Sequence, residues 1–236
     1  MNIIKDVFFD LDRTLWDFDK NSESALRIIY KELKLDNYSA SFDHFIKVYR
    51  EVNAKYWKDY GEGKIDKIQL RTGRFTDTLK EFKIDNLKMG ESMGERYLQL
   101  SPYQTHLFPS TKEVLTELKE SNYRLHIITN GFKEVQFTKL ENSGIRHFFD
   151  DVLCSEEVGQ SKPHPLVFQG ALKRTNARAD QSIMIGDDFK ADVIGAENAG
   201  IRGVLFDPEK KYNAHSNIER VEHLIEIPPL ILGVRK

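Results

Sequence analysis

Residues 6–16 read Asp-Val-Phe-Phe-Asp-Leu-Asp-Arg-Thr-Leu-Trp. This stretch opens as a short apolar run that stops at carboxylates, which is typical of a buried strand ending at a polar rim. Asp10 and Asp12 stand two residues apart, and alternate residues of a strand point to the same face. Their negative charges are therefore expected to crowd one end of a sheet, which is costly unless a cation or a shared proton intervenes.

Downstream of residue 103, short apolar strands alternate with helical stretches. Strands are predicted at 125–129, 151–154, 183–185 and 203–206, and helices at 111–121, 133–143, 165–175 and 188–199. This alternation indicates βαβ units and a parallel sheet with helices on both faces. The predicted fold class is α/β, with a Rossmann-like doubly wound parallel sheet as its core.

Between the first strand and the rest of the sheet, the apolar residues follow the spacing of helices instead. Leu26, Ile29, Tyr30 and Leu33 follow the spacing of an amphipathic helix, and further helices are predicted over 42–56, 66–82 and 87–100. We therefore predict an all-helical domain, residues 17–102, inserted into a core domain made of 1–16 and 103–236.

Composition narrows the function classes. The 236 residues carry a net charge of −2, so nothing resembles the basic footprint of a nucleic-acid-binding protein. No run of 18 apolar residues or signal peptide is found, which predicts no membrane association. The single cysteine, Cys154, indicates a reducing, cytoplasmic compartment. We expect a monomer or a homodimer.

The remaining predicted strands also end in polar residues. Thr129-Asn130-Gly131 follows one strand, Ser161-Lys162-Pro163 lies in a later loop, and Gly186-Asp187-Asp188 follows another strand. Ligands of open parallel sheets bind at the carboxyl ends of the strands. A third carboxylate, Asp187, favours Mg²⁺ among the acidic groups, whereas Lys162 and the Thr129 hydroxyl suit an anion. This combination is typical of a phosphoryl-transfer site.

Four groups of residues, taken in chain order, resemble the motifs of the haloacid dehalogenase (HAD) superfamily: residues 10–14, Thr129, Lys162, and Gly186-Asp187 with Asp192. The helical insert resembles the small cap domain of type C1 in that superfamily. The resemblance implies that Asp10 attacks phosphorus and becomes an aspartyl phosphate, while Asp12 protonates the leaving oxygen and later activates water. It also implies that the Asp10 side chain, the Asp12 main-chain carbonyl and Asp187 hold Mg²⁺.

The same resemblance assigns the phosphate-binding groups. Thr129 and Asn130 are expected to bind the phosphoryl oxygens, and Lys162 is expected to offset the charge of Asp10 and the phosphate. Asp192 is expected to orient Lys162 or a metal-bound water. For Asp188 we favour a structural role as a helix N-cap.

A narrower resemblance lies in the insert. Residues from Asn53 to Leu70, the triplet Gly73-Arg74-Phe75, and the stretches 129–132 and 155–159 are similar to the pyrimidine 5′-nucleotidase branch of the superfamily. This similarity implies a pyrimidine nucleoside 5′-monophosphate as the small-molecule substrate. Trp57, Phe18 and Arg74 are the predicted substrate-binding side chains.

Several alternatives remain open at this stage. A related phosphatase would act on a sugar phosphate, phosphoglycolate or another small metabolite, and a mutase would pass the phosphate to a second substrate. A 2-haloacid dehalogenase is disfavoured, because a halide leaves without a proton and dehalogenases lack an acid at the position of Asp12. A non-catalytic binding module is disfavoured because every motif residue is present.

Overall fold

The computed structural model describes residues 3–38, 41–212 and 218–233. The chain divides into an α/β unit, Met1–Phe18 with Thr105–Lys236, and a helical unit, Asp19–Gln104. Each boundary lies two residues beyond the boundary expected from the sequence, which fell after 16 and after 102. The outermost residues of the expected core domain, 1–2 and 234–236, lie outside the described residues.

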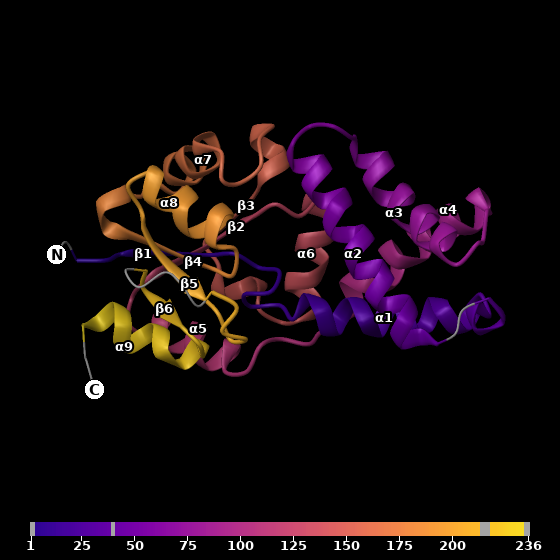
Figure 1. Ribbon diagram of the computed structural model, residues 1–236. Coiled ribbons are helices and arrows are strands. Elements are labelled where there is room, and N and C mark those ends of the chain that lie inside the picture. Colours follow the sequence, from indigo (N-terminus) through magenta and orange to yellow (C-terminus); the bar gives the residue numbers. More distant parts are fainter. Residues whose placement is uncertain (1–2, 39–40, 213–217, 234–236) are drawn as a thin grey trace. The chain divides into compact units, whose positions relative to one another are not determined.

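The described part of the α/β unit contains a six-stranded parallel sheet with the order β3-β2-β1-β4-β5-β6 (Figure 1). The strands are β1 (Asp6–Phe9), β2 (Arg124–Thr129), β3 (Asp151–Cys154), β4 (Ser182–Gly186), β5 (Arg202–Phe206) and β6 (Arg220–Val221). The predicted α/β fold class is confirmed, while the two-residue strand β6 was not predicted. The strand order reverses between β1 and β4, so the crevice that binds ligands in such sheets opens at their carboxyl ends.

Alternating residues of the strands form two apolar cores, one on each face of the sheet. Val7 and Phe9 of β1 lie in one core, and Phe8 between them lies in the other. Helices α5 (Thr111–Glu120), α6 (Lys133–Asn142) and α9 (Ile227–Leu232) contribute to the first core. Helices α7 (Pro165–Thr175) and α8 (Gly195–Asn198) cover the other face (Figure 1).

The segment predicted as one helix at 188–199 is helical but is not a regular α-helix. A π-helical turn, Phe189–Ile194, precedes the short α8. Such turns hold an extra residue and are frequent at functional sites, and this one carries Asp192. The Asp188 carboxylate accepts hydrogen bonds from the backbone N–H groups of Lys190 (2.9 Å) and Ala191 (2.8 Å), which confirms its expected N-cap role.

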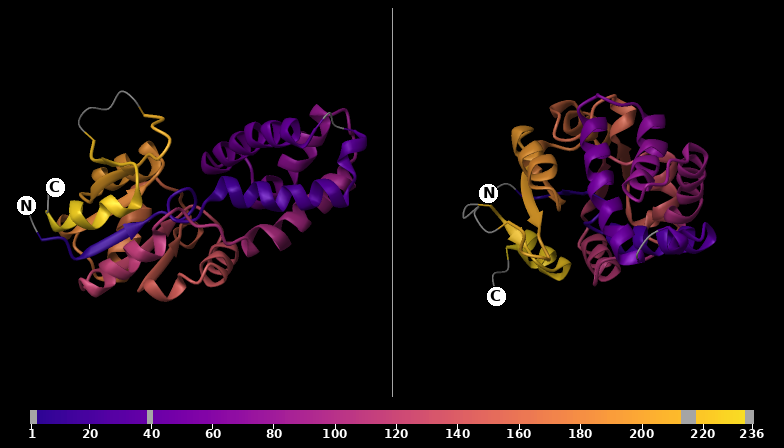
Figure 2. Two further views of the ribbon diagram at one scale, coloured as in Figure 1. Left: turned by 90° about the horizontal axis from the view of Figure 1, so that it is seen from below. Right: turned by 45° about the vertical axis from the view of Figure 1, so that its right-hand side comes forward.

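The helical unit contains α1 (Phe18–Glu32), α2 (Phe42–Gly61), α3 (Lys67–Glu81) and α4 (Leu87–Leu100). Helix α3 packs against both α2 and α4 (Figure 2). Its start is fixed by a capping box, in which Asp66 and Gln69 satisfy each other's backbone N–H groups. Among the described residues, none of the helices combines the length and the hydropathy that a membrane span requires.

The core of the helical unit depends on aromatic packing, which generates a first prediction. Phe75 of α3 is fully buried and stacks on Tyr49 at a centroid distance of 5.4 Å. Substituting Phe75→Ala is expected to lower the free energy of unfolding by about 3–5 kcal/mol, because it leaves a cavity. The matched control is Ile68→Ala on the same helix, where the side chain is 73% exposed. Urea denaturation of the two variants should separate them clearly, and equal losses would contradict this description of the core.

Candidate active site

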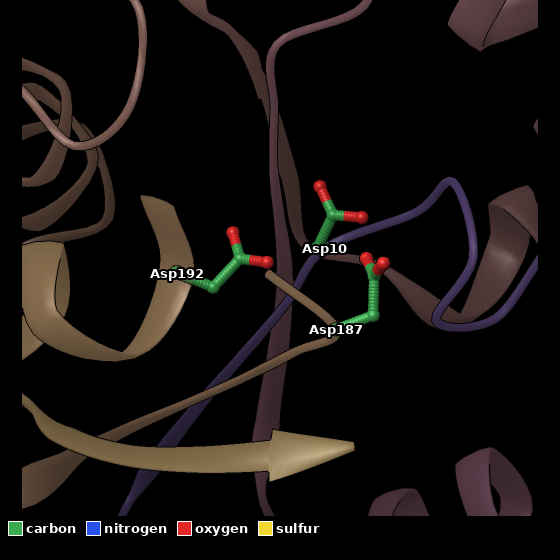
Figure 3. A group of neighbouring side chains, drawn as sticks. All are labelled: Asp10, Asp187 and Asp192. Carbon is green, nitrogen blue, oxygen red and sulfur yellow. The ribbon is translucent and has the colours of Figure 1, made fainter. Parts of the chain in front are cut away.

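Three carboxyl groups converge where the strand order reverses. Asp10 follows β1, Asp187 follows β4, and Asp192 comes from the π-helical turn (Figure 3). One oxygen of each carboxyl group lies within 4.8 Å of an oxygen of the other two. The structure therefore brings the predicted residues Asp10 and Asp187 together, as expected from the adjacent strands β1 and β4.

Lys162 lies in the middle of this cluster. Its Nζ atom is 2.6 Å from Asp10 Oδ1, 2.6 Å from Asp192 Oδ1 and 2.7 Å from the carbonyl oxygen of Ile128. The side chain is almost completely buried. One ammonium group thus bridges two carboxylates that reach it from different elements, and it is anchored to the backbone of β2 by the third contact.

The surrounding loops hold these groups in place. The Asn130 side chain accepts a hydrogen bond from the Lys162 backbone N–H (2.8 Å) and donates one to the Lys162 carbonyl (3.2 Å). Asp192 Oδ2 accepts from the Asp188 backbone N–H at 3.1 Å. A Cβ atom at Gly186 would lie 2.2 Å from Asp192 Oδ2, so only glycine allows β4 to pass this carboxylate so closely.

The negative charges in the cluster outweigh the single lysine. Burial, only partly offset by Lys162, raises the pKa of Asp10 to about 7. Burial together with the charges of Asp10 and Asp192 raises the pKa of Asp187 to about 8. Burial alone would lower the pKa of Lys162, but the neighbouring carboxylates prevail and raise it. The metal-free cluster therefore favours bound protons.

These residues fit a magnesium ion. Mg²⁺ takes oxygen ligands and is usually bound through one or two carboxylates, which Asp10 and Asp187 supply. A divalent cation would also favour the ionised form of both groups, whose pKa values are raised by burial and by repulsion between the carboxylates. Asp192 belongs to the same cluster and, like Asp10, is paired with Lys162. Its Oδ2 atom also accepts a hydrogen bond from the Asp188 backbone N–H, so both of its oxygens already have partners within the protein.

Asp12 has different neighbours. Its Oδ1 atom lies 2.6 Å from Lys139 Nζ, and its Oδ2 atom accepts a hydrogen bond from Gln136 Nε2 at 3.0 Å. Both partners lie on α6, and sequence reasoning missed them. A signal for both was present in the sequence. Residues 136, 139 and 140 lie on one face of the helix, so the apolar Leu140 marks a buried face on which two polar side chains are unexpected.

Thr129 joins the same network. Its Oγ1 atom accepts hydrogen bonds from Gln136 Nε2 (2.6 Å) and from the Gly131 backbone N–H (3.1 Å). A hydroxyl that accepts two hydrogen bonds retains its own proton for a further acceptor. This arrangement is compatible with the phosphate-binding role expected for Thr129, which stays a prediction together with that of Asn130.

The three residues expected to bind the rest of the substrate occupy different parts of the chain. Phe18 begins α1, and the Arg13 guanidinium lies 4.3 Å from its ring centroid. Trp57 and Arg74 lie in the helical unit. Arg74 is buried, donates from Nη1 to Asn53 Oδ1 (2.8 Å), and packs near aromatic rings. Substrate binding by Phe18, Trp57 and Arg74 stays a prediction.

Comparison with known proteins places the chain in a family. A family model described as haloacid dehalogenase-like hydrolase matches residues 7–206, and the chain belongs to this family. It is 30% identical over 223 residues to the ribulose-1,5-bisphosphate 5-phosphatase of Halopiger xanaduensis, covering 91% of this chain and 89% of that protein. It is 32% identical over 196 residues to the pyrimidine 5′-nucleotidase YjjG of Escherichia coli, covering 83% and 82%.

A solved structure agrees with this assignment. The HAD-hydrolase YfnB of Bacillus subtilis, crystallised with bound magnesium, superposes with a TM-score of 0.87 at 25% identity. The match covers 98% of this chain and 100% of that one. The expected resemblance to the HAD superfamily is confirmed, together with the parallel-sheet fold that it implied.

The raised carboxyl pKa values predict a pH-dependent stability of the metal-free protein. Asp10 and Asp187 have pKa values of about 7 and about 8 when folded, against an ordinary value of 3.8. The folded state therefore retains protons that the unfolded state has lost, so the free energy of unfolding falls as the pH rises from about 4 to about 8. In EDTA, Tm should decrease across this window. Added Mg²⁺ should raise Tm more at pH 8 than at pH 5, because protons compete for the same oxygens.

Asp187→Asn isolates this effect from other groups that titrate in the same range. The variant should show a shallower decrease of Tm with pH and a smaller gain from Mg²⁺ than the wild type. Asp180→Asn is the matched control, since this carboxylate pairs with Arg178 at the surface. Identical pH profiles for Asp187→Asn and the wild type would contradict the electrostatic description.

Proposed function

We propose that the protein is a magnesium-dependent phosphomonoester hydrolase that works through an aspartyl-phosphate intermediate. The observation that carries this proposal is the buried Asp10, whose Oδ1 atom is held 2.6 Å from Lys162 Nζ beside a second carboxylate, Asp187. A carboxylate fixed in this way presents its other oxygen, Oδ2, as a nucleophile. Membership of the haloacid dehalogenase-like hydrolases supports the same chemistry.

The chain's own residues divide the work of the first step. Asp10 Oδ2 attacks phosphorus in line with the leaving oxygen, the bond from phosphorus to that oxygen breaks, and Asp12 supplies a proton to it. Lys162 balances the charge of Asp10 and the incoming phosphate, and Thr129 donates to a phosphoryl oxygen. When bound by Asp10, Asp187 and the Asp12 carbonyl, Mg²⁺ would neutralise charge on the phosphoryl group.

The second step regenerates the enzyme. Water attacks phosphorus, the bond between phosphorus and Asp10 breaks, and Asp12 takes the proton that the water loses. Inorganic phosphate leaves, and Asp12 is again protonated for the next cycle. Most of the rate enhancement for such a reaction comes from positioning and charge neutralisation, which a rigid buried cluster can supply.

For the substrate we propose pyrimidine nucleoside 5′-monophosphates. Similarity to the nucleotidase YjjG supports this choice. Trp57 and Phe18 are the aromatic side chains that we propose for stacking on the base. The alternative is a phosphatase for a sugar phosphate, phosphoglycolate or a similar metabolite, which the similarity to the ribulose-1,5-bisphosphate 5-phosphatase supports. The presence of Asp12 argues against the 2-haloacid dehalogenase, whose halide leaves without a proton.

A nucleophile substitution tests the reaction itself. With Mg²⁺ present, the wild type should release inorganic phosphate from phosphomonoesters, whereas Asp10→Asn should lose on the order of 10⁴-fold or more in kcat. Asp180→Asn should retain wild-type turnover. Assays of phosphate release test whether the protein is a phosphatase. If the wild type hydrolyses no nucleotide, no sugar phosphate and no para-nitrophenyl phosphate, the proposal is refuted and a non-catalytic module is favoured.

The substrate class is tested by comparing pyrimidine nucleoside monophosphates with ribose 5-phosphate, which lacks the base. Stacking contributes roughly 1–3 kcal/mol per base. Trp57→Ala should therefore raise KM for the nucleotide roughly 5- to 150-fold while leaving KM for ribose 5-phosphate unchanged. Tyr38→Ala, which removes an exposed ring of the helical unit, serves as the control. A sugar phosphate preferred by the wild type, or an unchanged nucleotide KM in Trp57→Ala, would favour the alternative.

A further inference from the structure

Two side chains of α6 hold the carboxylate of Asp12 from both of its oxygens. Lys139 Nζ lies 2.6 Å from Oδ1, and Gln136 Nε2 lies 3.0 Å from Oδ2. The two donors are three residues apart, so they project from the same face of the helix. Asp12 itself stays partly accessible, with 23% of its side chain exposed. The carboxylate is thus fixed in orientation without being sealed from water.

The burial of Lys139 is costly for the fold. Only 3% of the residue is exposed, and Gln136 is completely buried. Lysine is rarely buried so deeply unless it is paired, and a buried ion pair is often no more stabilising than apolar residues of similar size. The Nζ atom also lies 4.2 Å from the ring centroid of Trp16, which shields it from solvent on that side. A helix that only had to cover the sheet would place apolar side chains at these positions.

Gln136 connects Asp12 to the phosphate-binding group expected at Thr129. The same Nε2 atom that donates to Asp12 also donates to Thr129 Oγ1 at 2.6 Å. One amide group therefore fixes the relative positions of two side chains that reach the site from different strands. Its Oε1 atom is buried and makes no hydrogen bond to the described residues, so the contacts of this amide group to Asp12 and Thr129 are both made by Nε2.

We propose that Lys139 and Gln136 are positioning residues that fix the orientation of the Asp12 carboxyl group for the second half of the reaction. Each group holds a different oxygen of Asp12, so the side chain cannot rotate freely between the two steps. In the second step Asp12 accepts the proton of the attacking water while the bond between phosphorus and Asp10 breaks. This inference rests on the proposed hydrolase function.

The inference is tested with para-nitrophenyl phosphate and Mg²⁺, because nitrophenolate leaves without needing a proton. In Lys139→Met the aspartyl phosphate should form at nearly the wild-type rate but break down about 10²-fold more slowly, as expected for a displaced base. Stopped-flow absorbance should show a burst of about one nitrophenolate per active site. In the steady state, kcat and KM should fall together while kcat/KM changes little.

Three further variants make the experiment decisive. Lys133→Met removes an exposed lysine of the same helix that pairs with Glu157, and it should behave as the wild type. Lys139→Arg keeps the charge and should recover part of the breakdown rate. Gln136→Met should give a burst of its own, and it carries the test alone if Lys139→Met does not fold by circular dichroism.

The outcomes separate this inference from the proposed function. A wild type without phosphatase activity refutes the function. An active wild type with no burst in Lys139→Met or Gln136→Met, or with equal loss in the burst and steady-state phases, refutes the positioning role and leaves the function intact.

Discussion

The candidate site depends on one buried ammonium group that is shared by two carboxylates. Lys162 lies 2.6 Å from both Asp10 and Asp192, while Asp187 adds a third negative charge to the same cluster. One positive charge cannot balance three, and burial, together with the charges of the neighbouring carboxylates, raises the pKa values of Asp10 and Asp187. An arrangement that is unfavourable when empty is suited to recruiting a divalent cation and then an anionic substrate.

The sheet explains how such a cluster can form at all. Strands β1 and β4 are adjacent and parallel, so the residues that follow them, Asp10 and Asp187, are necessarily neighbours. Close approach requires Gly186, since any side chain there would collide with Asp192. The same order of strands places the loop that carries Lys162 within reach of Asn130 at the end of β2. The strand order therefore brings these loops together, and Gly186 and Asn130 allow the charged side chains to approach one another closely.

Much of this could be predicted from the sequence, because the strands are short apolar runs and their polar ends carry the chemistry. The residues that escaped prediction are those whose role depends on long-range contacts. Lys139 meets Asp12 across 127 positions of sequence, so its place on one helix face with Gln136 and Leu140 does not by itself reveal its partner. The two-residue strand β6 offers no periodicity to detect, and the π-helical turn at 189–194 cannot be told from an α-helix by spacing alone.

We expect a magnesium ion and a phosphoryl group to meet at Asp10. A crystal structure grown with Mg²⁺ and beryllium fluoride, a mimic of the phosphoryl group, would show whether they do. The metal ion should be bound by Asp10 and Asp187, with the fluoride complex attached to Asp10 Oδ2 and Lys162 still at Oδ1. A map in which the side chains of Asp10 and Asp187 turn apart, with neither ion nor fluoride complex between them, would contradict this expectation.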